Sequence, residues 1–115
     1  MSDARLKGIL TRVQRGGAEK YHAKNTKEGK LFARERIARL IDEGSFEEEA
    51  ALANNVDHDL PADGVVTGTA TVNGRTVAIM ANDSTIKAGS WGWRTVEKIL
   101  RIQEIAKELQ CPLLY

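Results

Sequence analysis

A strand, a tight turn and a second strand between residues 65 and 81 constrain the fold more than any other part of the sequence. The run VVTGTATV, residues 65–72, alternates two sets of side chains, which is typical of a strand with two unlike faces. Asn73-Gly74 follows, and this pair favours the type I′ turn of a β-hairpin. Residues 76–81 form the return strand and are apolar enough to be buried on both faces. The sequence therefore predicts a buried antiparallel hairpin.

Helical periodicity precedes this hairpin in three segments. Residues 4–15 carry apolar side chains at helical spacing, and Gly16-Gly17 ends the pattern. Residues 18–25 are a weaker candidate. Residues 31–42 form a stronger helix with an apolar stripe, and Gly44 supplies its C-terminal stop. We expect residues 1–44 to be an N-terminal helical segment.

A further helix and strand follow the hairpin. Residues 95–109 have helical spacing, and residues 112–115 begin another strand. The helix is expected to turn most of its apolar side chains inward, namely Val96, Ile99, Leu100, Ile102, Ile105, Ala106 and Leu109. The order after Gly64 is therefore strand, hairpin, strand, loop, helix and strand, which predicts an α/β unit of ββα type. Because the chain ends in the apolar run CPLLY, we expect a longer polypeptide of which this is the front part.

Composition limits the classes of function. The length of 115 residues suits one domain, and a net charge of +1 gives no argument for nucleic acid or membrane partners. The N-terminus is polar and no apolar run approaches the ~20 residues of a membrane span, so a cytoplasmic location is expected. Residues 1–44 carry 11 Lys/Arg against 6 Asp/Glu, a net of +5. This basic half could meet phosphates, or it could be a solvated helical face.

No metal site or catalytic triad is predicted. His22, His58 and Cys111 lie far apart without ligand spacing. The run Asp57-His58-Asp59 is typical of an exposed polar turn.

The loop after the return strand is the strongest candidate for a site. Gly89 and Gly92 allow a ligand to approach the backbone, and free amides at the following helix start can bind an oxygen anion. Lys87 adds positive charge. The alternative is that both glycines serve turn geometry while Trp91 and Trp93 cover the core. Spacing alone leaves both interpretations open.

Two blocks of the sequence identify a family resemblance. The runs GKLFARERIARLIDEGSF and DGVVTGTATVNGRTVAIMANDSTIKAGSWGWRTVEKILRIQEIA resemble the start of the biotin-dependent acyl-CoA carboxyltransferases, the β subunits of propionyl-, acetyl- and methylcrotonyl-CoA carboxylases. The resemblance covers residues 16–115. Phe32, Ser84 and Ala88 depart from the family's usual residues. The N-D-x-T-x-K form of the loop looks most like the methylcrotonyl-type branch.

The resemblance implies a fold, an activity and partners. The fold is an α/β, crotonase-like ββα spiral fragment preceded by N-terminal helices. Residues 45–115 are then the first part of the family's N-terminal crotonase-like domain, truncated at its C-terminal end. The activity is transfer of a carboxyl group from carboxybiotin to the α carbon of a short-chain acyl-CoA. Biotin is carried by a partner, a biotin carboxyl carrier or biotin carboxylase subunit, and the complete β subunit forms a homo-oligomer. The tryptophans are expected to wedge the last helix onto the sheet.

The resemblance also implies the site residues. The expected substrate-binding residues are Lys87, Ala88, Gly89, Ser90, Gly92, Arg34 and Arg36. No catalytic residue is expected within the chain, because the glycine amides that form the family's oxyanion hole follow after Tyr115. Two alternatives stay open: a stand-alone CoA-binding or assembly domain without catalysis, and a fragment of the α subunit of a sodium-pumping acyl-CoA decarboxylase.

Overall fold

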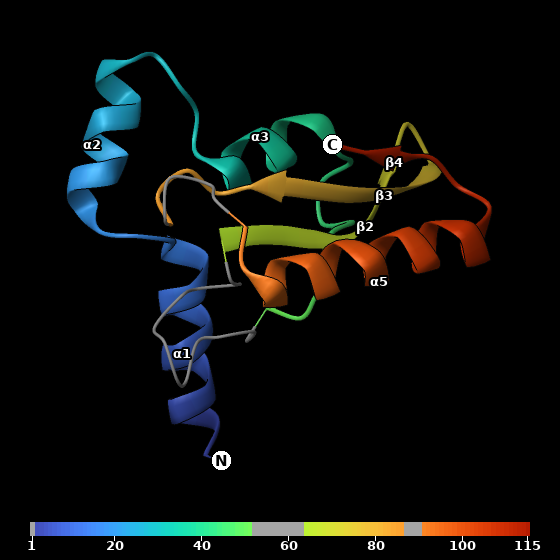
Figure 1. The fold of residues 1–115 in the computed structure, drawn as a ribbon, viewed down its shortest axis with the longest axis horizontal. Coiled ribbons are helices and arrows are strands. Elements are labelled where there is room, and N and C mark those ends of the chain that lie inside the picture. Colours follow the sequence, from blue (N-terminus) through green and yellow to red (C-terminus); the bar gives the residue numbers. More distant parts are fainter. Residues whose placement is uncertain (1, 52–63, 87–90) are drawn as a thin grey trace.

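A four-stranded sheet lies between two helices, and two further helices extend away from it (Figure 1). The computed structural model describes residues 2–51, 64–86 and 91–115. The helices are α1 (Asp3–Arg15), α2 (Glu19–Lys27), α3 (Ala33–Leu40) and α5 (Trp93–Leu109), and the strands are β1 (Glu47–Glu49), β2 (Val65–Val72), β3 (Arg75–Asn82) and β4 (Leu113–Leu114). Their spatial order in the sheet is β1-β2-β3-β4. Only β4 runs parallel to its neighbour.

The predicted hairpin is confirmed. β2 and β3 pair antiparallel from Val65 opposite Asn82 to Val72 opposite Arg75. Asn73 and Gly74 have φ values of 51° and 78°, the positive pair that a type I′ turn requires. The alternation in β2 directs its side chains to two cores, with Val65 on one side and Val66 on the other.

The two faces of the sheet are covered by different helices. α5 packs Ile99, Ile102 and Ile105 against a cluster that includes Val65 and Met80. α3 contributes Ile37 to the opposite cluster, which contains Val66, Ala70, Val77 and Ile79. The hairpin is therefore the middle layer of the molecule, as its apolar return strand predicts. None of the helices in the described residues is long and apolar enough to cross a membrane.

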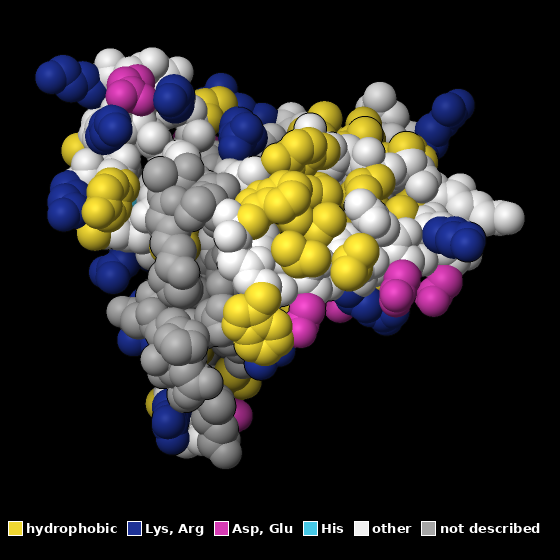
Figure 2. Space-filling model, in the orientation of Figure 1, with side chains coloured by type: hydrophobic (Ala, Val, Ile, Leu, Met, Phe, Trp, Pro, Cys, Tyr) yellow, Lys and Arg dark blue, Asp and Glu magenta, His cyan; other side chains and the backbone are white. Residues whose placement is uncertain are grey.

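One face of α5 is more exposed than its sequence predicts. Val96, Leu100 and Leu109 are 44%, 55% and 51% exposed, so the prediction that they turn inward is wrong. The sheet contacts one stripe of the helix, which is filled by residues such as Ile99 and Ile102. Figure 2 shows hydrophobic side chains gathered on the face in view, over the sheet and α5.

α3 ends earlier than the glycine stop predicts. Its last residue is Leu40, and Ile41 is already extended at φ −95° and ψ 164°. The reason is Asp42, whose carboxylate accepts hydrogen bonds from the Thr71 hydroxyl at 2.6 Å and from the backbone amides of Asn73 and Gly74. These bonds fix the chain after α3 to the hairpin turn, and they hold the pKa of Asp42 below its ordinary value, with the Thr71 hydroxyl as the largest cause.

Candidate functional site

The chain leaves β3 through a buried turn. Asp83 and Thr85 are each only 2% exposed. Asp83 Oδ1 accepts hydrogen bonds from the Thr85 amide at 2.9 Å and from the Thr85 hydroxyl at 2.5 Å. The Asp83 amide donates to the carbonyl of Gly64, and the Ile86 amide donates to the carbonyl of Asp83. Side chain and backbone together fix the first residues of the candidate loop.

The N-terminal helices contact this turn directly. The amide of Gly17, between α1 and α2, donates to Thr85 Oγ1 at 2.9 Å. Asn25 of α2 donates from Nδ2 to Ser84 Oγ at 3.0 Å. A Cβ on Gly17 would lie 1.9 Å from the Thr85 carbonyl oxygen, so only glycine permits this approach. The contacts join the two parts of the chain that the sequence separates at residue 44.

The end of the loop is the N-cap of α5. Gly92 is extended and its amide donates to the Thr95 hydroxyl at 2.9 Å. Glycine has no side chain with which to cap the first turn of the helix. The first amides of a helix carry partial positive charge and favour an anionic group. Gly92 therefore remains a candidate for contact with a negatively charged ligand.

The two tryptophans do not wedge the helix onto the sheet. Trp91 is 54% exposed and Trp93 is 65% exposed, so that prediction is wrong. The guanidinium of Arg94 lies 3.9 Å from the centre of the Trp93 ring. The Trp91 indole donates to Asn82 Oδ1 at 3.3 Å. Both rings therefore lie at the surface with polar partners, and isoleucines such as Ile99 and Ile102 hold α5 on the sheet.

Asn82 joins three segments at the carboxyl end of β3. Its Oδ1 accepts from Trp91, and its Nδ2 donates to the Tyr115 hydroxyl at 2.8 Å. Its carbonyl accepts from Arg36 Nη2 at 3.2 Å. β3 and β4 are parallel, so their carboxyl ends lie at the same edge of the sheet, where ligands of α/β folds gather. Sequence reasoning did not single out Asn82, because its three partners lie in other elements.

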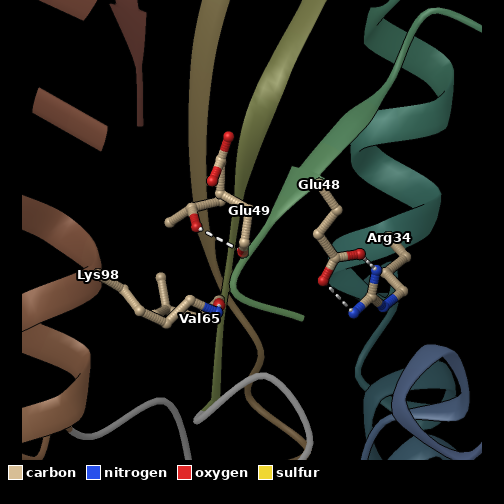
Figure 3. Close-up of polar contacts among 6 residues, drawn as sticks. Arg34, Glu48, Glu49, Val65 and Lys98 are labelled. Carbon is tan, nitrogen blue, oxygen red and sulfur yellow. Dashed lines mark hydrogen bonds and ion pairs between the residues drawn. The ribbon is translucent and has the colours of Figure 1, made fainter. Parts of the chain in front are cut away.

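The two candidate arginines have different surroundings. Arg34 forms a bidentate ion pair with Glu48 of β1, with nitrogen–oxygen distances of 2.5 and 3.0 Å (Figure 3). Both side chains are mostly buried, at 16% and 15% exposure. Arg36 instead reaches the end of β3 beside the loop. The structure thus brings Arg36 near Asn82 and places Arg34 against β1.

Lys87, Ala88, Gly89 and Ser90 lie outside the described residues. Within residues 2–51, 64–86 and 91–115, no group of three His, Cys, Asp or Glu side chains could hold a metal ion.

A buried lysine was missed by sequence reasoning. Lys98 is 5% exposed, and its Nζ donates to the Val65 carbonyl at 2.5 Å (Figure 3). The contact ties α5 to the start of β2. Its position in the sequence could have predicted its burial, because Lys98 adjoins Ile99 and lies one helical turn before Ile102, within the apolar stripe that faces the sheet.

Comparison with known proteins decides the family. The model of the carboxyl transferase domain matches residues 24–115. The chain belongs to the carboxyl transferase domain family. This match extends from the C-terminal part of α2 to the last strand, so it includes both arginines and the whole candidate loop.

Relatives and a solved structure support the same assignment. The chain is 58% identical over 104 residues to the uncharacterized carboxylase YngE of Bacillus subtilis, covering 90% of this chain and 20% of that protein. It is 41% identical over 114 residues to the mitochondrial methylcrotonoyl-CoA carboxylase beta chain of Dictyostelium discoideum, covering 96% and 19%. The chain therefore spans about one fifth of the length of these curated relatives.

The fold predicted from the resemblance is also confirmed. A crystal structure of transcarboxylase 12S, with methylmalonyl-coenzyme A and methylmalonic acid bound, superposes with a TM-score of 0.89 at 33% identity. The superposition covers 96% of this chain and 22% of the other. The helices followed by a mixed sheet are thus a part of the carboxyl transferase domain fold, which is crotonase-like.

Proposed function

We propose that the complete protein carrying this chain is the carboxyltransferase component of a biotin-dependent acyl-CoA carboxylase. It would transfer a carboxyl group to the α carbon of a short-chain acyl-CoA. The observation that carries the proposal is the match of residues 24–115 to the carboxyl transferase domain. Biotin on a partner carrier protein or biotin carboxylase subunit would supply the carboxyl group.

In this proposal the loop of residues 83–92 lies along the acyl-CoA. Gly89 has no Cβ to obstruct the thioester or the pantetheine arm, and Lys87, Ala88 and Ser90 flank it. The amides beyond Gly92 favour a negatively charged group. The thioester oxygen becomes negative when the α carbon loses its proton, and backbone amides aimed at it stabilise the transition state by ~3 kcal/mol per donor. We place those catalytic amides after Tyr115 in the complete protein.

The arginines of α3 complete the proposed acyl-CoA face. Arg36 lies beside the loop, where its guanidinium can pair with the phosphates of coenzyme A. Arg34 also stays in the proposed set, but Glu48 holds its guanidinium in this structure, and a spacing of two residues does not put it on the same helix face as Arg36. The complete subunit is proposed to act as a homo-oligomer in the cytoplasm.

Replacement of one loop glycine tests the proposal. Gly89→Val in the complete protein should raise the acyl-CoA KM or lower kcat, because the new side chain occupies the path of the ligand. Gly8→Val is the matched control, since nothing lies within 4 Å of the position of its Cβ on α1. An intact Gly89→Val protein with unchanged kcat/KM would remove the loop from the site.

A further inference from the structure

The hairpin turn between β2 and β3 presents an Asn-Gly pair to water. Asn73 and Gly74 are both exposed, and a Cβ built on Gly74 would meet no atom within 4 Å. The backbone nitrogen that follows an asparagine can attack the side-chain amide carbon, and glycine obstructs that attack least because it has no side chain. Asn73 is the only asparagine in the sequence that precedes a glycine. The turn is therefore the place where intramolecular deamidation meets the least steric resistance.

Deamidation of Asn73 would proceed through a cyclic imide. The Gly74 nitrogen loses its proton to the solvent and attacks Cγ of Asn73, and the bond from Cγ to Nδ2 breaks to release ammonia. Water then opens the succinimide ring at one of its two carbonyls. Opening at Cγ gives aspartate, and opening at the backbone carbonyl gives isoaspartate. The net reaction converts the amide and one water into a carboxylate and ammonium.

Asp42 opposes the first step at the attacking nitrogen. Its Oδ2 accepts a hydrogen bond from the Gly74 amide at 2.9 Å, and its Oδ1 accepts from the Asn73 amide at 3.0 Å. The Thr71 hydroxyl donates to the same Oδ2 at 2.6 Å and holds the carboxylate in place. Loss of the Gly74 proton would set two negative charges beside each other, which Coulomb repulsion disfavours.

The conformation of the turn opposes the same step. Asn73 and Gly74 have φ values of 51° and 78°, in the left-handed region. In a type I′ turn the nitrogen of the second residue lies across the Cα–C bond from the Cβ of the first. Attack on Cγ therefore requires the peptide unit between Asn73 and Gly74 to rotate, and this rotation breaks the hydrogen bond from Gly74 to Asp42.

We propose that Asn73 is a site of deamidation and that Asp42 protects it by holding the Gly74 amide. The reaction has a structural consequence, because isoaspartate adds a carbon to the backbone of a two-residue turn whose geometry sets the pairing of β2 and β3. These strands fill both cores of the molecule. Deamidated protein should therefore unfold at a lower temperature than unmodified protein.

Peptide mapping by mass spectrometry tests the proposal in the complete protein, incubated at mildly alkaline pH. Asp42→Ala should accelerate conversion of Asn73 about tenfold or more, because a hydrogen bond to a charged group no longer restrains the turn. The product should contain both aspartate and isoaspartate. Asn25 and Asn82 in the same digests are internal references that should stay unconverted, since threonine and aspartate follow them.

Two further variants separate loss of protection from general unfolding. Ile102→Ala removes a fully buried side chain far from the turn in sequence, and its rate at Asn73 should stay within about twofold of wild type. Thr71→Val is a milder change that keeps the Asp42 carboxylate, so its rate should lie between those of wild type and Asp42→Ala. The proposal is overturned if Ile102→Ala accelerates conversion as much as Asp42→Ala, if Asp42→Ala has no effect, or if isoaspartate never forms.

Discussion

The ion pair between Arg34 and Glu48 makes a quantitative prediction about stability. Glu48→Gln keeps the side-chain shape and removes the negative charge from the pair. The two side chains are 16% and 15% exposed and share two hydrogen bonds. A hydrogen bond to a charged group contributes about 1.5–3 kcal/mol, and removing one partner of a fully buried pair costs about 3–5 kcal/mol. Because this pair is partly solvated, we expect a loss of about 2 kcal/mol in the free energy of unfolding.

Urea denaturation of the 115-residue chain measures this loss. In thermal unfolding of the same chain, a loss of about 2 kcal/mol corresponds to a decrease in melting temperature of roughly 6–12 °C. Glu104→Gln is the control, because Glu104 pairs with Arg101 on the surface of α5 at 65% and 56% exposure. Exposed pairs of this spacing contribute about 0.3–0.5 kcal/mol.

Glu48→Gln should lower the free energy of unfolding more than Glu104→Gln does. If Glu48→Gln changes the free energy of unfolding no more than Glu104→Gln does, burial does not strengthen the Arg34 pair. A double-mutant cycle with Arg34→Met should also give a coupling energy of about 1–2 kcal/mol. A coupling energy near zero would show that the variants act separately.

Three further outcomes are expected. The hydrogen bonds that Asp42 accepts lower its pKa, so Asp42 stabilises the fold above its unfolded pKa, and this contribution is lost as pH falls through the lower folded pKa. Asp42→Asn should therefore be less stable at neutral pH, and its stability should depend less on pH in acid unfolding followed by circular dichroism. Ile102→Ala removes a fully buried side chain and should cost about 2–5 kcal/mol in urea denaturation, against little for the control Leu100→Ala, whose side chain is 55% exposed. The 115-residue chain alone should carboxylate no free biotin from malonyl- or methylmalonyl-CoA, and turnover near that of the complete protein would contradict the placement of the catalytic amides.

Local patterns predicted the elements of the fold. The hairpin follows from period-two alternation and from Asn73-Gly74, whose backbone conformation few other pairs adopt. Helical periodicity located α1, α2, α3 and α5 to within a few residues. Periodicity was less successful at choosing which side of α5 is covered, because its apolar residues extend beyond the stripe that the sheet contacts, as the exposed Val96 and Leu100 show.

Contacts between distant residues could not be predicted from these patterns. Gly17 and Thr85 are 68 residues apart, and Asp42 and Thr71 are 29 apart. Each pair depends on how separate elements pack, and a glycine or an aspartate in a polar loop has the same local sequence whether or not a partner approaches it. The family resemblance pointed to the loop after β3, but not to the hydrogen bond between Gly17 and Thr85 at its start.

Carboxyl transfer by the complete protein tests the account most directly. Purified complete protein is incubated with free biotin and malonyl- or methylmalonyl-CoA, and release of the decarboxylated acyl-CoA is followed with and without biotin. The account predicts biotin-dependent turnover that Gly89→Val weakens and Gly8→Val does not. Saturable binding of coenzyme A without biotin-dependent turnover would contradict it and favour a non-catalytic CoA-binding domain.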